Sequence, residues 1–221
     1  MIKAVIFDMD GLMFDTEALA KEAWFRVGTK LGYPIMEAHI ARIRGSTPAA
    51  SAAVFREAFG AGFDYPRAKA MRNTMVEEVI DRQGVPIKHG LVGLLEQLDR
   101  HGLKAAVASS SPRKTVEKYL ALAGISRYFS CIVGAEDVTR SKPAPDAFLL
   151  AAHRLQIPPD ACLVLEDSGN GLQGAHRAGM KVICIPDIAL PPKECLSLAS
   201  AVFPDLTYVF DWIIAISTYH I

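Results

Sequence analysis

Two carboxylates stand close together near the start of the chain. Asp8 and Asp10 follow an apolar run at residues 4–7 and are followed by Gly11. Residues two apart in a strand point to the same face, and glycine lets the backbone turn sharply, so both carboxylates can converge on one small volume. A carboxylate is also a competent nucleophile toward phosphorus. The pair therefore predicts phosphoryl-transfer chemistry, the alternative being a plain strand-ending turn.

Three further apolar runs, at 103–108, 131–134 and 161–165, also lead into polar residues. Such runs, alternating with helix-length segments, are typical of a parallel sheet covered on both faces, and ligands bind at the carboxyl ends of its strands. We therefore expect an α/β fold with a doubly wound parallel sheet that gathers these polar residues in one crevice. They are Ser109, Ser110, Ser111, Lys142, Glu166 and Asp167.

In this order, the four motifs resemble those of the haloacid dehalogenase-like hydrolases, specifically the β-phosphoglucomutase-like branch that acts on sugar phosphates. The resemblance covers residues 1 to about 187. It implies a Rossmann-like core, with Asp8 as the nucleophile and Asp10 as the general acid and base. The phosphate-binding residues that it implies are Ser109, Ser110 and Lys142. Dehalogenation and phosphonate cleavage are disfavoured, because those branches typically lack a second Asp.

The charges of these residues require a cation. Four acidic side chains face one lysine, and a phosphate dianion would add two negative charges, so the crevice would repel its own substrate. Oxygen ligands with no His or Cys nearby are those that Mg²⁺ prefers. We therefore expect magnesium rather than zinc. Its predicted ligands are Asp8, Asp10, Glu166 and Asp167.

Residues beside two of the motifs predict helix starts. Ser110 and Ser111 are placed to cap a helix that begins near Pro112. Lys142 precedes Pro143, and proline suits the first turn of a helix. The lysine is therefore expected to project from a loop at the start of that helix.

Between residues 15 and 87 the apolar spacing becomes helical. We expect a helical cap domain at 15–87, inserted after the first strand of a core domain at 1–14 and 88–221, with hinges near 14–17 and 86–90. A cap placed there can exclude water and select the substrate. One face of its first helix is traced by Leu19, Ala23, Val27 and Leu31.

Cap and hinge residues are the candidates for contact with the remote part of an anionic substrate, because arginine and short polar side chains bind anions. Trp24 is expected in the core of the cap rather than as a platform for a sugar. We do not assign His39 or His89 as a base, since neither has an identified partner. The substrate-binding candidates are Thr16, Glu17, Arg44, Gly45, Thr47 and Arg72.

The composition excludes several other classes. With 24 basic and 24 acidic residues the net charge is zero, and no basic stripe predicts a nucleic-acid partner. The sequence has no signal-like start that would predict export and no run of about 18 apolar residues that would predict a membrane span. We therefore expect a cytoplasmic enzyme. The four cysteines form no Cys-x-x-Cys pair and are expected as reduced core thiols.

The tail at 191–221 is the least informative segment. The apolar run at 210–214 predicts a final helix that packs on the sheet. We expect a monomer, with a dimer contact through this tail as the alternative.

These features predict a magnesium-dependent phosphatase that hydrolyses a small phosphorylated metabolite, a sugar phosphate, through an aspartyl-phosphate on Asp8. A phosphomutase and a catalytically silent sugar-phosphate-binding module are the alternatives. In β-phosphoglucomutase the first cap helix carries a His and the following cap loop an Arg, and ungapped spacing places Ala20 and Pro48 there. Their absence favours water as the phosphoryl acceptor. The intact acid pair argues against the silent module.

Overall fold

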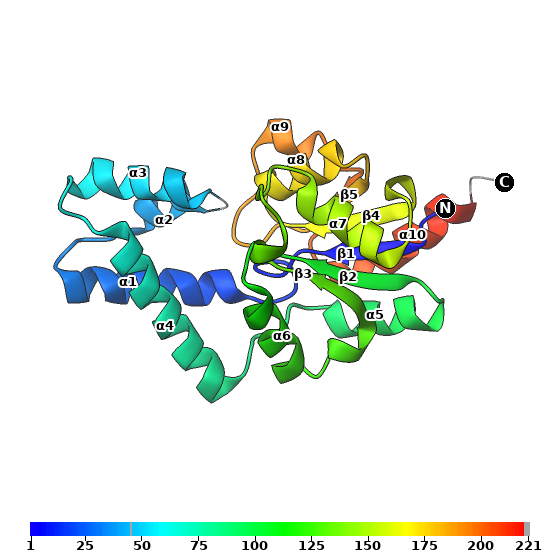
Figure 1. Ribbon diagram of the computed structural model, residues 1–221, viewed down its shortest axis with the longest axis horizontal. Coiled ribbons are helices and arrows are strands. Elements are labelled where there is room, and N and C mark those ends of the chain that lie inside the picture. Colours follow the sequence, from blue (N-terminus) through cyan, green and yellow to red (C-terminus); the bar gives the residue numbers. More distant parts are fainter. Residues whose placement is uncertain (45, 219–221) are drawn as a thin grey trace. The chain divides into compact units, whose positions relative to one another are not determined.

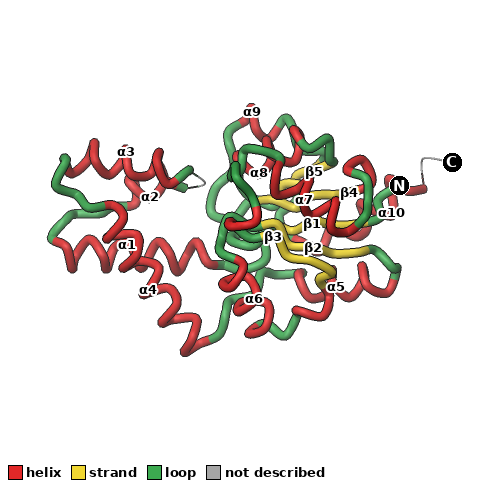
Figure 2. The backbone as a smooth tube through the Cα atoms, in the orientation of Figure 1, coloured by secondary structure: helices red, strands yellow, loops and turns green. Residues whose placement is uncertain are grey.

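A computed structural model describes residues 1–44 and 46–218 of the 221-residue chain. The chain forms two compact units, one of Met1–Asp15 with Pro86–Ile221 and the other of Thr16–Val85. The first unit holds the strands, and the described part of the second is built from helices alone (Figures 1 and 2). The second unit is therefore an insertion that follows the first strand.

A parallel sheet forms the centre of the first unit. Its strands lie in the order β3-β2-β1-β4-β5-β6, and every neighbouring pair is parallel. This confirms the predicted doubly wound α/β fold. β6 was not expected, because two residues are too few for a sequence pattern. The strands are β1 (Ala4–Phe7), β2 (Lys104–Ala108), β3 (Phe129–Val133), β4 (Cys162–Glu166), β5 (Lys181–Cys184) and β6 (Ala201–Val202).

Helices cover both faces of this sheet, which explains why β1 is apolar and buried throughout. α7, α8 and α9 pack on the face that contains Ala4 and Ile6. α5 and α6 cover the opposite face (Figure 1), and α10 packs against α5. The helices are α5 (Leu91–Arg100), α6 (Arg113–Leu122), α7 (Asp146–Leu155), α8 (Gly169–Arg177), α9 (Lys193–Leu196) and α10 (Val209–Thr218). The 3₁₀ turns are η1 (Ser126–Tyr128), η2 (Ala135–Asp137), η3 (Pro159–Ala161) and η4 (Leu206–Tyr208).

α10 is the final apolar helix that the sequence predicts, but its main packing partners are α5 and η4 rather than the sheet itself. It buries Val209, Phe210 and Ile213. The cysteines Cys162, Cys184 and Cys195 are buried free thiols, and Cys131 is half-buried. Across the described residues, no helix combines the length and the apolar character needed to cross a membrane.

The second unit has an aromatic core of its own. The ring of Phe55 lies 4.9 Å from those of Trp24 and Phe63, so Trp24 is in the core as expected. Of the predicted face of the first helix, Ala23 and Val27 are buried, whereas Leu19 and Leu31 are only half-buried. The buried face is instead completed by residues that include Ala20 and Trp24. The helices are α1 (Thr16–Leu31), α2 (Glu37–Ile43), α3 (Pro48–Phe59) and α4 (Tyr65–Gln83).

The register of the sheet determines which residues meet at its carboxyl edge. Phe7, the last residue of β1, pairs with Val107 on β2 and with Leu165 on β4. The residues that follow these three positions therefore leave the sheet side by side. The loops at this edge carry Asp8, Ser109 and Asp167.

Candidate active site

A tight turn after β1 presents the two leading carboxylates. The backbone amide of Asp8 donates to the carbonyl of Leu165 at 3.0 Å, which holds the residue beside β4. The amides of Met13 and Phe14 then both donate to the carbonyl of Met9. Gly11 has a φ of +85°, a conformation that side chains disfavour, so glycine is required there. The turn leaves Asp8 buried and Asp10 partly exposed.

Lys142 joins the first acid to the acid that ends β4. Its ammonium donates hydrogen bonds to Oδ1 of Asp8 and, at 2.6 Å, to Oε1 of Glu166. Lys142 is 7% exposed and Glu166 is fully buried. The Nζ atom also lies 4.8 Å from the ring centroid of Phe148, within the range of a cation–π interaction. Residues from three separate loops and strands therefore meet around one buried cation.

The charges of this cluster do not balance. Burial raises the pKa of Asp8 to about 7, an effect that Lys142 opposes and Glu166 reinforces. Burial alone would lower the pKa of Lys142, but the carboxylates of Asp8 and Glu166 outweigh burial and hold that pKa above its usual value. Lys142 therefore stays protonated at neutral pH while two buried carboxylates share it. Ionisation of both Asp8 and Glu166 would leave an excess of one negative charge over Lys142, and a further cation would favour that ionised form.

Glu166 has both carboxylate oxygens engaged. While Oε1 accepts from Lys142, Oε2 accepts at 3.0 Å from the amides of Asp167 and Ser168 and from the Ser168 hydroxyl. Gly171 packs directly against this carboxylate, and a Cβ on residue 171 would overlap it. The first turn of α8 is therefore shaped around Glu166.

The serine motif after β2 contacts Asp10. The hydroxyl of Ser111 donates to Oδ2 of Asp10 at 2.7 Å, and the amide of Ser111 donates to the hydroxyl of Ser109 at 3.0 Å. Ser109 is buried, whereas Ser110 is exposed. Ser111 was predicted to cap a helix because it precedes Pro112. That prediction is wrong, because its hydroxyl bonds Asp10 instead.

α6 begins at Arg113, next to the predicted start near Pro112, but the predicted serine cap is absent. No side chain caps α6 from its N-cap residue, Pro112. Instead, both carboxylate oxygens of Glu136, on η2, accept from the amide of Arg113 at 3.1 Å. α7 begins at Asp146, so Pro143 lies before the helix and not in its first turn as expected, whereas Lys142 lies in a loop as expected.

Asp167 faces back toward the turn that carries Asp10. A Cβ atom placed on Gly11 would lie 3.0 Å from Cγ of Asp167 and even closer to Oδ2 of Asp167. A side chain on residue 11 would therefore displace the Asp167 carboxylate. The predicted acids Asp8, Asp10, Glu166 and Asp167 all lie at the same edge of the sheet.

The donor atoms around this edge fit a magnesium ion. They are oxygens, the ligands that Mg²⁺ prefers. Among residues 1–44 and 46–218, no three His, Cys, Asp or Glu side chains form a group arranged to hold a metal by themselves. An ion here would therefore need oxygens from water and substrate as well. That combination, with one or two carboxylates, is the usual coordination of Mg²⁺ at phosphate sites.

The predicted substrate-binding residues belong to the second unit, whereas the acid cluster belongs to the first. Thr16 is buried at the start of α1, beside Glu17. The hydroxyl of Thr47 accepts from the amide of Ala50 and so caps α3. Gly45 lies outside the described residues. The substrate roles of these residues remain predictions.

Two arginines of the second unit have buried N–H groups without hydrogen-bond partners. In Arg44 these are Nε and Nη2, and the latter lies 3.8 Å from Glu37. In Arg72 the group is Nε, and the guanidinium lies over the ring of Trp24 at 5.7 Å. Donors of this kind suit an anionic ligand.

Sequence reasoning missed one acid at the same edge of the sheet. Asp187 follows β5 by three residues, and its side chain is buried beside Gly11. Its ion-pair partner is Lys88. The signal that identified the other acids, a polar residue just after an apolar strand, also applies to Asp187.

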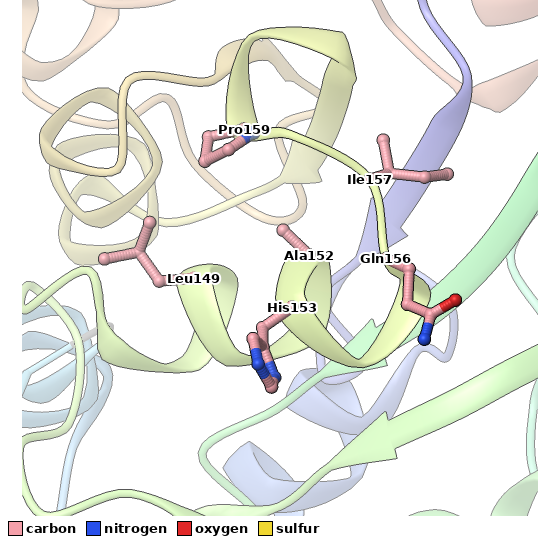
Figure 3. A pocket seen from close by; sticks show the side chains of 6 residues that line it. All are labelled: Leu149, Ala152, His153, Gln156, Ile157 and Pro159. Atoms are coloured by element: carbon pink, nitrogen blue, oxygen red, sulfur yellow. The ribbon is translucent and has the colours of Figure 1, made fainter.

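An open pocket lies elsewhere on the first unit. Figure 3 shows its six lining side chains, which are mostly apolar and include no carboxylate. They come from the end of α7 and from the segment before β4, at the amino edge of the sheet. The pocket is therefore separate from the acid cluster at the carboxyl edge. Its lining residues are Leu149, Ala152, His153, Gln156, Ile157 and Pro159.

Known proteins resemble this chain in sequence and in fold. Fructose-1-phosphate phosphatase YqaB of Escherichia coli is 34% identical over 181 residues, which cover 81% of this chain and 94% of YqaB. The phosphorylated carbohydrates phosphatase of Thermotoga maritima is 31% identical over 182 residues, 82% of this chain and 84% of that protein. The crystal structure of β-phosphoglucomutase from Clostridium difficile matches with a TM-score of 0.79 and 26% identity, covering 97% of this chain and 96% of that one.

The chain also matches parts of longer proteins. It spans 18% and 51% of the lengths of two Arabidopsis thaliana relatives that are 34% and 32% identical to it. A family model described as haloacid dehalogenase-like hydrolase matches residues 5–185, which include all four motifs at the sheet edge. As those motifs predicted, this chain belongs to the haloacid dehalogenase-like hydrolases.

Proposed function

We propose that this protein is a magnesium-dependent phosphatase that hydrolyses a small sugar phosphate through an aspartyl-phosphate on Asp8. The observation that carries the proposal is the buried contact of Lys142 with Asp8 and Glu166. Phosphoryl transfer depends mainly on positioning and on relief of charge at the phosphoryl oxygens. A protonated, immobilised lysine beside a carboxylate nucleophile meets both requirements.

In the first step, a carboxylate oxygen of Asp8 attacks phosphorus, and the bond between phosphorus and the sugar oxygen breaks. The departing oxygen takes a proton from the carboxyl group of Asp10. Ser111, through its 2.7 Å hydrogen bond to Oδ2, holds Asp10 in position. Ser109 and Lys142 bind the transferring phosphoryl group.

In the second step, Asp10, now a carboxylate, takes a proton from water. That water attacks phosphorus, the bond to Asp8 breaks, and inorganic phosphate leaves. The two steps restore both aspartates to their starting protonation states. Asp10 therefore acts as acid and then as base, which agrees with its partly exposed position.

Asp8, Asp10 and Asp167 would hold magnesium, with Glu166 supporting the site through Lys142 and the amides after β4. When bound, the ion would neutralise carboxylate and phosphate charge. Such neutralisation is needed because burial and neighbouring acids favour the protonated form of Asp8, which is not nucleophilic.

We propose the helical second unit as the cap that selects the substrate. Arg44 supports this role, because its buried N–H groups lack an acceptor that a substrate anion would supply. YqaB and the Thermotoga maritima phosphatase are named for sugar or carbohydrate phosphates, which favours that substrate class.

A phosphomutase is the second candidate, favoured by the likeness to β-phosphoglucomutase. A mutase must protect its phospho-enzyme from water until a second hydroxyl arrives, and Ala20 and Pro48 stand where that enzyme's cap has a His and an Arg. We therefore expect little conversion of β-glucose 1-phosphate to glucose 6-phosphate with a bisphosphate primer. Efficient isomerisation with negligible phosphate release would favour the mutase instead.

The direct test of the proposed function is a screen of phosphorylated metabolites in the presence of MgCl₂, with released inorganic phosphate as the readout. We expect hydrolysis of several sugar phosphates with modest selectivity. A protein that binds sugar phosphates but releases no phosphate from any of them would be the silent binding module.

A further inference from the structure

Asp187 is a buried acid that the proposed reaction does not use. It lies in the loop after β5, and its side chain is 6% exposed. Lys88 donates to its Oδ1 atom and also lies 3.9 Å from Oδ1 of Asp15. The other oxygen, Oδ2, is buried and has no hydrogen-bond partner.

The unpartnered oxygen lies beside the turn that follows Asp8 and Asp10. It lies 3.4 Å from the position that a Cβ atom on Gly11 would occupy. Cγ of Asp167 lies 3.0 Å from the same point. The carboxylates of Asp167 and Asp187 therefore approach each other across a glycine that has no side chain to separate them.

This arrangement is costly unless something lies between the two acids. A buried polar atom without a partner has lost its hydration and gained no hydrogen bond in exchange, which destabilises the folded protein. Lys88 compensates one negative charge, but the charge on Asp167 also faces this space. A water molecule alone would satisfy Oδ2 without reducing the repulsion. A water bound to a cation would do both, because such a water is a strong donor.

We propose that Asp187 is a positioning residue of the magnesium site, with Oδ2 accepting a hydrogen bond from a metal-bound water and Lys88 fixing the carboxylate from the other side. The inference rests on the proposed function, because it requires magnesium beside Asp167. Mg²⁺ commonly keeps several of its waters in proteins.

The test is the dissociation constant of Mg²⁺ without substrate, measured by isothermal titration calorimetry. Asp187→Asn should weaken binding by about tenfold or more, as loss of a group that orients a metal's ligands does. Asp187→Ala, which leaves no amide beside Asp167, should weaken Mg²⁺ binding by a similar factor. Asp160→Asn is the matched control, because it removes an equal charge at the exposed amino edge of the same sheet.

Circular dichroism in EDTA shows that each variant is folded before titration. If folded Asp187→Asn and Asp187→Ala bind Mg²⁺ as tightly as the wild-type protein, the role of Asp187 is refuted and the proposed function stands. If the wild-type protein neither binds Mg²⁺ nor releases phosphate from any sugar phosphate, the proposed function fails and the inference fails with it. Weakening in both Asp187 variants, with Asp160→Asn unchanged, supports the inference.

Discussion

Lys142 donates a 2.6 Å hydrogen bond to Glu166 in the interior of the protein, where neither side chain is appreciably exposed. The same ammonium also bonds Asp8. One lysine thus supports two acids from different strands. Removing one partner of a buried ion pair leaves an uncompensated charge, which is more costly than exchanging the whole pair for apolar groups.

Lys142→Met should therefore lower the free energy of unfolding by about 3–5 kcal/mol at neutral pH, as broken buried pairs do. Urea denaturation measures the change. Adding Glu166→Gln to the variant should restore part of the loss, because one of the two facing carboxylates is then neutral. Lys181→Met, at an exposed position at the start of β5, is the control and should be near neutral. A Lys142→Met protein as stable as the wild type would contradict the buried pairing.

Gly171→Ala should displace Glu166, because the added Cβ would overlap its carboxylate. We expect a loss of about 1–3 kcal/mol in stability, the usual cost of overpacking, together with reduced phosphatase activity. Gly93→Ala is the control: it lies in α5 with open space around its Cβ position, and alanine there should stabilise by about 0.5–1 kcal/mol. Equal, small effects at both glycines would show that α8 tolerates the methyl group.

Asp137 predicts a pH-dependent contribution to stability. Hydrogen bonds from Arg154, and further ones from the amide of Gly134 and from Arg113, hold the pKa of Asp137 well below its usual value, although burial opposes them. A carboxyl whose pKa is lowered by folding stabilises the protein above the pKa of the unfolded chain, about 3.9, and loses that contribution as the pH falls through the folded pKa.

Asp137→Asn should therefore lower the free energy of unfolding by about 1 kcal/mol at pH 7, a typical value for partly exposed charged hydrogen bonds. The difference from the wild type should shrink as the pH falls below about 4, where the carboxyl begins to protonate in the unfolded chain. Guanidinium titrations across that range measure it. A gap that widens toward acid pH would give the opposite sign and contradict the assignment.

Removal of magnesium should abolish phosphate release. EDTA is expected to stop hydrolysis and excess Mg²⁺ to restore it, and Asp167→Ala should raise the Mg²⁺ concentration needed or eliminate activity. Asp160→Ala serves as the control. Full activity of the wild-type protein after exhaustive chelation would contradict the metal requirement.

The sequence predicted the central strands and their polar ends, because Ala4–Phe7 and the runs that lead into the other motifs are short, almost wholly apolar segments of a sheet that is covered on both faces. The sequence could not show whether Ser111 caps the following helix or donates a hydrogen bond to Asp10, because either role is compatible with a serine just before that helix. Asp187 follows an apolar strand as the other acids do, so its position could have been predicted from the sequence. Its approach to Gly11 and Asp167 could not, because those residues are distant from it in the sequence. The sequence did predict Arg44 as a substrate-binding candidate, but the lack of hydrogen-bond acceptors for its Nε and Nη2 becomes visible only when burial is known.

Transfer of the phosphoryl group from substrate to Asp8 can be followed directly. The wild-type protein and Asp8→Asn are mixed with the best sugar phosphate from the screen, labelled in its phosphoryl group, in MgCl₂ and quenched in acid after a short interval. The account predicts label on the peptide that contains Asp8 in the wild-type protein, no label in Asp8→Asn, and a fall in hydrolysis by several orders of magnitude. Normal turnover by folded Asp8→Asn would contradict it.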